Sequence, residues 1–180
     1  NDVEYFKRGY IFSLRTKSFL KVLISIDIDK FKTEILSRIS ANMTTVIFGN
    51  KDTEIIAKCQ LIRRLSYSIL ICDKNQFSDD LPIIHEKLVE ILKSPFSLLH
   101  IEVYNCIRAL LITVDSKYLT NLWPTVISVL IQLFSVSDPH NLINTDYTMY
   151  MILGTACKLL DLRFFIFKCF FINNILQFFS

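Results

Sequence analysis

Apolar residues recur at intervals of three and four along nearly the whole chain, with polar residues between them. This spacing is typical of amphipathic α-helices that bury one face against a neighbour. The pattern predicts helices over residues 3–24, 29–39, 52–71, 79–93, 96–114 and 119–136, and a seventh that begins near Asp146. The sequence therefore predicts an all-α fold.

Two stretches interrupt this pattern. Residues 40–51 ("SANMTTVIFGNK") indicate a linker, and residues from about 136 to 146 indicate a loop. The helix predicted over 29–39 follows two aspartates, Asp27 and Asp29. Either one is suited to cap it, because a carboxylate can accept hydrogen bonds from the unpaired N–H groups of a first turn.

Two of the predicted helices are similar in sequence. "FSDDLPIIHEKLVEIL" (residues 77–92) aligns without gaps on "LTNLWPTVISVLIQLF" (residues 119–134), so that Pro82 matches Pro124 and 124 − 82 = 42. Each copy follows a longer amphipathic helix, and a helix pair of about 40–47 residues is the period of HEAT and armadillo repeats. We therefore expect antiparallel helix pairs stacked as HEAT/armadillo-like repeats. The residues expected to anchor them are Leu81, Pro82, Leu88, Trp123, Pro124 and Leu130.

The second copy carries no charge and holds the single tryptophan of the chain. Its few polar residues form one narrow stripe, which would face lipid if the helix crossed a membrane. We therefore expect a helix buried on most sides, with residues 147–160 packed over Ile127 and Val129. If these two side chains are exposed instead, they form the candidate interaction patch.

Composition narrows the class of protein. Hydrophobic residues make up 52% of the 180 residues, and three glycines and four prolines are too few for an all-β fold. The net charge of +3 is too small to indicate nucleic-acid binding. Five cysteines contain no C-x-x-C pair, so we expect reduced, mostly buried thiols in the cytosol and no zinc site.

No pattern of catalytic residues is present. The three histidines lack H-x-x-x-H spacing, and no phosphate-binding glycine loop or nucleophile motif occurs. His85 is expected on a solvated face, Asp79 and Asp80 are expected to complement a helix dipole, and Arg63 with Arg64 is expected to be solvated. The sequence therefore predicts a protein that is not an enzyme and has no catalytic, cofactor-binding or metal site and no small-molecule substrate.

Residues 163–180 differ from the rest, because seven of the fifteen phenylalanines lie in "RFFIFKCFFINNILQFF". This run is shorter than the about 20 apolar residues of a spanning helix, and it includes Lys168 and several amides. The alternatives are a helix buried in a following repeat, an interfacial or anchoring membrane helix, and a non-native tail from an unspliced intron or a frameshift. We treat residues 1–162 as one helical segment and residues 163–180 as a divergent tail.

The order of several short motifs resembles the C-terminal region of the Dopey family. "KTEILSRIS" (32–40) precedes "IFGNKDTE", "LIRRLSYSIL", "LPIIHEKLVEIL", "YLTNLWPTVISVLIQLF" and "ACKLLDL" (156–162). The elements "LTNLWP" and "ACKLLDL" in that order carry most of the resemblance, which covers roughly residues 6–162.

The resemblance implies a large cytosolic scaffold of vesicle-mediated protein transport, bound peripherally to the cytosolic face of Golgi and endosomal membranes. Its implied partners are a relative of the Arf exchange factors, a phospholipid flippase and, for some members, kinesin. Two other interpretations stay open: a membrane-anchored helical protein that uses the Phe-rich tail, and a generic α-helical repeat domain with another role.

Overall fold

The computed structural model describes the backbone of residues 14–40, 51–136 and 147–178, and the side chains of 17–39, 52–136 and 147–162. All regular structure in these ranges is helical, which confirms the predicted all-α class. The elements are α2 (Leu14–Ser25), α3 (Ile28–Ser40), α4 (Lys51–Ile71), the 3-10 helix η2 (Ser78–Asp80), α5 (Leu81–Leu92), α6 (Leu98–Thr113), the 3-10 helix η3 (Ser116–Leu122), α7 (Trp123–Val136) and α8 (Tyr147–Phe178). Residues 41–50 of the predicted linker, 137–146 of the predicted loop and 3–13 of the first predicted helix lie outside the described residues.

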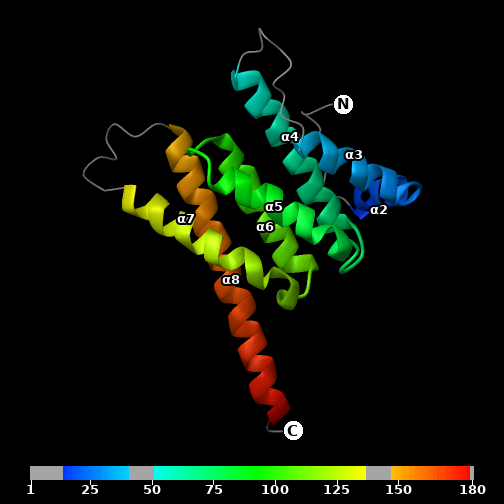
Figure 1. Cartoon of the computed structure of the whole chain (residues 1–180). Helices are drawn as coiled ribbons and strands as arrows, with labels where there is room; N and C mark the ends of the chain where they lie inside the picture. The colour runs from blue at the N-terminus through cyan, green and yellow to red at the C-terminus, as the bar shows by residue number, and fades with distance from the viewer. Residues whose placement is uncertain (1–13, 41–50, 137–146, 179–180) are drawn as a thin grey trace.

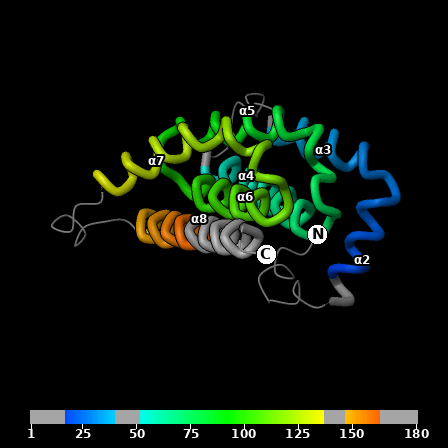
Figure 2. Tube along the Cα trace, turned by 90° about the horizontal axis from the view of Figure 1, so that it is seen from below, coloured from blue at the N-terminus to red at the C-terminus, as the bar shows by residue number. Residues whose placement is uncertain are grey.

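The helices lie in two layers, which Figure 1 shows from one side and Figure 2 from below. One layer, which we call the inner layer, contains α4, α6 and α8, and the other, which we call the outer layer, contains α3, α5 and α7. α6 lies between α4 and α8, which form its most extensive contacts, and it also contacts α5. α6 is therefore buried around most of its circumference, and Val103, Tyr104 and Ile107 have no exposed surface.

The tryptophan helix begins later than predicted. The chain forms a 3-10 helix over Ser116–Leu122, and the α-helix starts only at Trp123. Pro124 is therefore the second residue of α7, and Pro82 occupies the same place in α5. A proline in a first turn removes an N–H that has no partner within the helix, so its cost there is small. The two helix starts are 123 − 81 = 42 residues apart, which matches the separation in the sequence.

The turn after α4 is tied to the turn after α6. Asn75 has a φ of 62°, a left-handed conformation that asparagine tolerates better than most residues. Its Nδ2 donates to Asp115 Oδ2 at 2.9 Å, and its Oδ1 accepts from the Asp115 backbone N–H at 3.0 Å. Its own N–H donates to the Thr113 carbonyl at 3.1 Å. Lys74 Nζ adds an ion pair to Asp115 Oδ1 at 2.6 Å, and this ammonium holds the pKa of Asp115 below its ordinary value.

α3 has one predicted cap at its start and one unpredicted ion pair with the turn before α5. The Lys30 N–H donates to Asp27 Oδ1 at 3.3 Å, so Asp27 caps α3. Asp79 and Asp80 were expected to complement the dipole of the next helix, and both lie at such a start, in η2 directly before α5. Asp80 also forms an ion pair with Lys32 of α3 at 2.8 Å, and both side chains are largely buried. The Lys32 ammonium also donates to the Gln76 carbonyl, so this contact fixes α3 against the turn before α5.

Candidate interaction surfaces

An ion pair joins α4 to α6 in the middle of the molecule. Glu102 of α6 is 5% exposed, and Arg63 of α4 binds it through Nε, at 3.2 Å from both carboxylate oxygens. A further bond joins Arg63 Nη2 to Glu102 Oε1. The hydrogen bonds to Glu102 raise the pKa of the Arg63 guanidinium, so Arg63 stays charged. The expectation that Arg63 is solvated holds in part, since 42% of its side chain is exposed, but the ion pair with the buried Glu102 carboxylate was not predicted.

Two thiols near this pair are too buried to react. Burial, with Glu102 nearby, raises the pKa of Cys59 to about 11. Burial raises the pKa of Cys106 to about 12. Only the thiolate is a strong nucleophile or metal ligand, so both side chains act as small apolar groups at neutral pH. This confirms the predicted burial of these two cysteines, whereas Cys157 is exposed and Cys72 is half-buried.

His100 is a structural residue at the start of α6. It has no exposed surface, and its Nδ1 accepts a hydrogen bond from the Ser97 N–H at 3.3 Å. Its ring packs against Phe96 and Tyr104, with centroid distances of 5.0 Å and 6.5 Å. Burial lowers the pKa of His100, although backbone hydrogen bonds at Leu92 and Ser97 oppose the shift. The neutral His100 ring therefore caps the start of α6 by accepting the hydrogen bond from the Ser97 N–H.

The second histidine in this region is not on the solvated face that was expected. His85 of α5 is half-buried, and burial lowers its pKa. Its Nε2 is covered and has no hydrogen-bond partner among the described residues. Within the part of the chain that the structure describes, no three His, Cys, Asp or Glu side chains are placed to share a metal ion.

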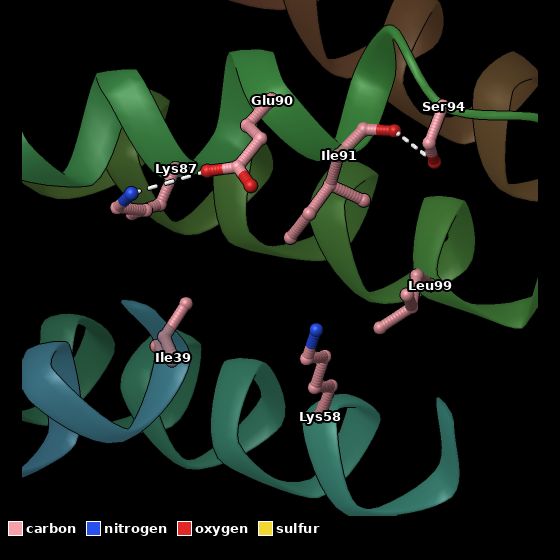
Figure 3. Close-up of a pocket in the computed structure, with 7 residues that line it drawn as sticks. All are labelled: Ile39, Lys58, Lys87, Glu90, Ile91, Ser94 and Leu99. Carbon is pink, nitrogen blue, oxygen red and sulfur yellow. Dashed lines mark hydrogen bonds and ion pairs between the residues drawn. The ribbon is translucent and has the colours of Figure 1, made fainter. Parts of the chain in front are cut away.

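A cavity of about 210 Å³ opens where four helices meet (Figure 3). Ile39 of α3, Lys58 of α4, Ile91 of α5 and Leu99 of α6 line it, together with Lys87, Glu90 and Ser94. Lys58 pairs with Glu54 at 3.1 Å, and Lys87 pairs with Glu90 at 3.1 Å. Because carboxylates already pair with both ammonium groups, the cavity has the character of a solvated seam between helices and not of an anion site.

A second hollow of about 350 Å³ lies on the layer formed by α4, α6 and α8. The Arg63–Glu102 pair forms its polar part, and Ile56, Leu98 and Met151 contribute apolar walls from three helices. All three apolar side chains are at least 42% exposed, so this layer presents an open and partly apolar surface.

The predicted anchor residues divide by type. Leu81, Leu88 and Leu130 are 5% exposed or less and belong to the core. Trp123 is partly buried and packs against the core, whereas Pro82 and Pro124 are exposed. The leucines therefore hold the helices together by burial, and the prolines act through the backbone of the first turn.

The two residues of the candidate patch have different environments. Val129 is 6% exposed, whereas Ile127 is 51% exposed. α8 does contact α7, but α8 packs mainly beside α6, so residues 147–160 do not cover Ile127 as expected. Ile127 lies on one helix face with Ile131 and Phe134, which are 62% and 42% exposed. We name these three residues, Ile127, Ile131 and Phe134, the α7 stripe.

One segment among the described residues, Ser116–Val136, is long and apolar enough to cross a membrane by length and composition alone. A helix in the core of a globular protein meets the same criteria. α7 buries Val126, Val129, Leu130 and Leu133 on the side turned toward the other helices. Burial in the core therefore explains the apolar residues on one face of α7, but it does not explain those of the α7 stripe.

Sequence reasoning missed the polar contacts between helices: Arg63–Glu102, Lys32–Asp80 and Asn75–Asp115. Only Glu102 gave a signal, because it is a single carboxylate within the apolar run of α6. A buried carboxylate requires a cation, but its partner lies 39 residues earlier in the chain. The turn residues gave no signal, because their pairing depends on how the helix pairs are placed.

These observations define the class: a layered all-helical protein with structural polar pairs, buried thiols and an uncovered apolar helix face. A family model described as DOP1 C-terminal matches residues 2–166 of the chain. The chain therefore belongs to the Dopey (DOP1) family, as the motif order predicted. No solved structure gives a significant match.

Curated relatives agree with the family model. The chain is 28% identical over 116 residues to Protein DOP1 homolog of Drosophila melanogaster, which covers 62% of this chain and 4% of the relative. It is 30% identical over 149 residues to Protein dop1 of Emericella nidulans, covering 76% of this chain and 8% of the relative. With mouse Protein DOP1B it shares 31% identity over 78 residues, covering 43% of this chain and 3% of the relative. The matched region is thus a small part of much longer relatives.

Proposed function

We propose that the chain is a non-catalytic protein-interaction segment of a Dopey-like scaffold in vesicle-mediated transport between Golgi and endosomes. The observation that carries the proposal is the family match over residues 2–166. The uncovered α7 stripe supports it, because exposed apolar patches on folded proteins mark contact sites. The mechanism is docking, with no bond made or broken.

The architecture that would do this is a stack of HEAT/armadillo-like helix pairs. The 42-residue separation of α5 and α7 supports it, as does the division into an α3–α5–α7 layer and an α4–α6–α8 layer. Each pair contacts its neighbours along the stack, which gives repeat proteins extended surfaces for partners. The partners proposed are an Arf-exchange-factor-like scaffold, a phospholipid flippase and kinesin, at the cytosolic face of Golgi and endosomal membranes.

The proposal is tested by fractionating the full-length protein from its native cell. We expect it in Golgi and endosomal membrane fractions, with trafficking proteins co-purifying, and we expect carbonate at high pH to release it. A full-length protein that is found with neither membranes nor trafficking partners would refute the proposal. A carbonate-resistant protein would favour the membrane-anchored alternative, for which Ser116–Val136 and the tail are the candidate segments.

A further inference from the structure

The α7 stripe occupies positions that are covered in the sister helix. In the gap-free alignment, Ile127, Ile131 and Phe134 correspond to His85, Val89 and Leu92 of α5. Leu92 is 2% exposed and Phe134 is 42% exposed. His85 and Val89 are half-buried, whereas Ile127 and Ile131 are more than half exposed. The matching helix face is therefore covered by neighbours in α5 and exposed in α7.

The neighbours of α5 explain the difference. Lys87 and Ile91 of α5 line the cavity shared with Ile39 of α3, so that side of α5 is turned toward α3 (Figure 3). His85, Val89 and Leu92 lie at i, i+4 and i+7 on a different face of α5. Besides α3, the outer-layer helix that contacts α5 is α7, so we assign this second face to the contact with α7. Val129 corresponds to Lys87 and is buried, as expected for the side of α7 turned toward α5. The α7 stripe then points to the place where a further outer-layer helix would continue the row.

No helix among the residues that the structure describes fills this place. Shifted by 42 residues, α7 (123–136) corresponds to residues 165–178, since 123 + 42 = 165 and 136 + 42 = 178. Those residues continue α8, which runs as one helix from Tyr147 to Phe178. The segment that the repeat register assigns to the next outer-layer helix is thus part of α8.

We propose that the α7 stripe binds an amphipathic α-helix supplied by another protein, packed beside α7 as α7 packs beside α5. The partner helix presents apolar residues at i, i+3 or i+4, and i+7, and it has no charge at the contact, because α7 offers no charge to pair with it. This inference rests on the proposed function, since it gives that interaction segment a docking face.

The test places a photo-crosslinking amino acid at position 131 of the full-length protein in its native cell. The matched control is position 83, because Ile83 lies on α5 and is 47% exposed. We expect position 131 to crosslink to a helical segment of another protein, identified by mass spectrometry, and position 83 to give no such product. Crosslinks to the protein's own chain, to a second copy or to lipid would overturn the proposal, as would no crosslink at all.

Substitution gives an independent measurement. We expect Ile131→Glu to reduce co-purification of the crosslinked protein at least tenfold and Ile83→Glu to leave it unchanged, with both variants folded by circular dichroism. Equal retention in the two variants would overturn the proposal. Failure of the proposed function is a separate result: a partner at position 131 that has no connection with Golgi or endosomal traffic leaves the docking face in place and refutes only the trafficking role.

Discussion

At the scale of single residues, burial decides which polar groups have structural roles. Glu102, His100 and Tyr104 lie together on α6, and each is 5% exposed or less. Glu102 is paired with the Arg63 guanidinium, whereas the His100 ring is held neutral by burial. Stability should therefore depend on the partner of Glu102 in one case and on the pH in the case of His100.

Removing Arg63 leaves a buried carboxylate without its cation. We expect Arg63→Ala to lower the free energy of unfolding by about 2 kcal/mol, below the about 3–5 kcal/mol of a fully buried pair, because 42% of the Arg63 side chain is exposed and water replaces part of the interaction. Urea denaturation measures the difference. The double variant Arg63→Met/Glu102→Met should recover most of the loss, since it removes both charges. A double variant less stable than Arg63→Ala would contradict this account.

The buried histidine makes stability depend on pH in a defined direction. Burial lowers the pKa of His100 from 6.5 in the folded state, so the unfolded chain binds the proton first as the pH falls. The stabilisation is fully present above pH 6.5 and decreases below it, by at most about 1.4 kcal/mol per pH unit for one group.

The variant His100→Gln tests this dependence, because glutamine can still accept the Ser97 N–H and does not titrate. We expect the free energy of unfolding to fall less steeply for the variant than for the natural chain between pH 6.5 and 5.5. Some slope should remain, because burial also lowers the pKa of His85. Identical slopes in the two proteins would show that His100 does not contribute.

At the scale of helices, the sister pair α5 and α7 shows how one template serves two positions. The leucines at matching places are buried in both copies, and the first-turn prolines coincide. The differences follow from the neighbouring helices. Among the described residues, α5 has an outer-layer helix on each side and α7 has one on the side of α5 alone.

Exchanging residues between the two helices tests this difference. Val129→Lys gives α7 the lysine that α5 carries at the matching position 87, but at a buried site. It should lower the free energy of unfolding by about 3 kcal/mol, because the ammonium loses water without gaining a partner. Ile127→His gives α7 the histidine that α5 carries at the matching position 85, at an exposed site. It should change the free energy of unfolding by no more than about 0.5 kcal/mol. Thermal unfolding of the two variants measures the contrast. Equal losses would mean that Val129 and Ile127 have similar surroundings.

The sequence predicted these elements to different degrees. Helix periodicity placed α4 and α6 to within two residues at each end, because their apolar positions repeat strongly. It extended the tryptophan helix too far toward the N-terminus, because residues 119–122 have the same apolar character in a 3-10 helix as they would in an α-helix. It offered Asp27 or Asp29 as the cap of α3, and the structure shows Asp27 in that role. It did not predict the ion pairs of Asp80 and Arg63, because their partners lie about 40–50 residues away and residue spacing within one helix does not reveal them.

At the scale of the whole molecule, α6 is the centre around which both layers assemble. Cys106 lies on it with no exposed surface, and its pKa is raised to about 12. Its thiolate can therefore form at an appreciable rate only after the layers separate. Cys157 on α8 is exposed and serves as an internal reference.

We expect iodoacetamide at pH 7.5 to label Cys157 rapidly and Cys106 only under conditions that unfold the whole protein. Mass spectrometry of labelled peptides across a urea series should give the same midpoint for Cys106 as circular dichroism gives for helix content. Labelling of Cys106 well below that midpoint would show that α6 becomes accessible without global unfolding.

The bond between Asn75 and Asp115 also has a mechanical consequence. It joins the turn after α4 to the turn after α6 at one edge of the molecule, through two hydrogen bonds and the Lys74 ion pair. Hydrogen bonds depend on distance and angle, so these contacts hold the two turns at one separation, whereas apolar contacts between helices are non-directional. When the molecule bends under load, we expect the two turns to stay in contact. The helix ends at the opposite edge should then separate first.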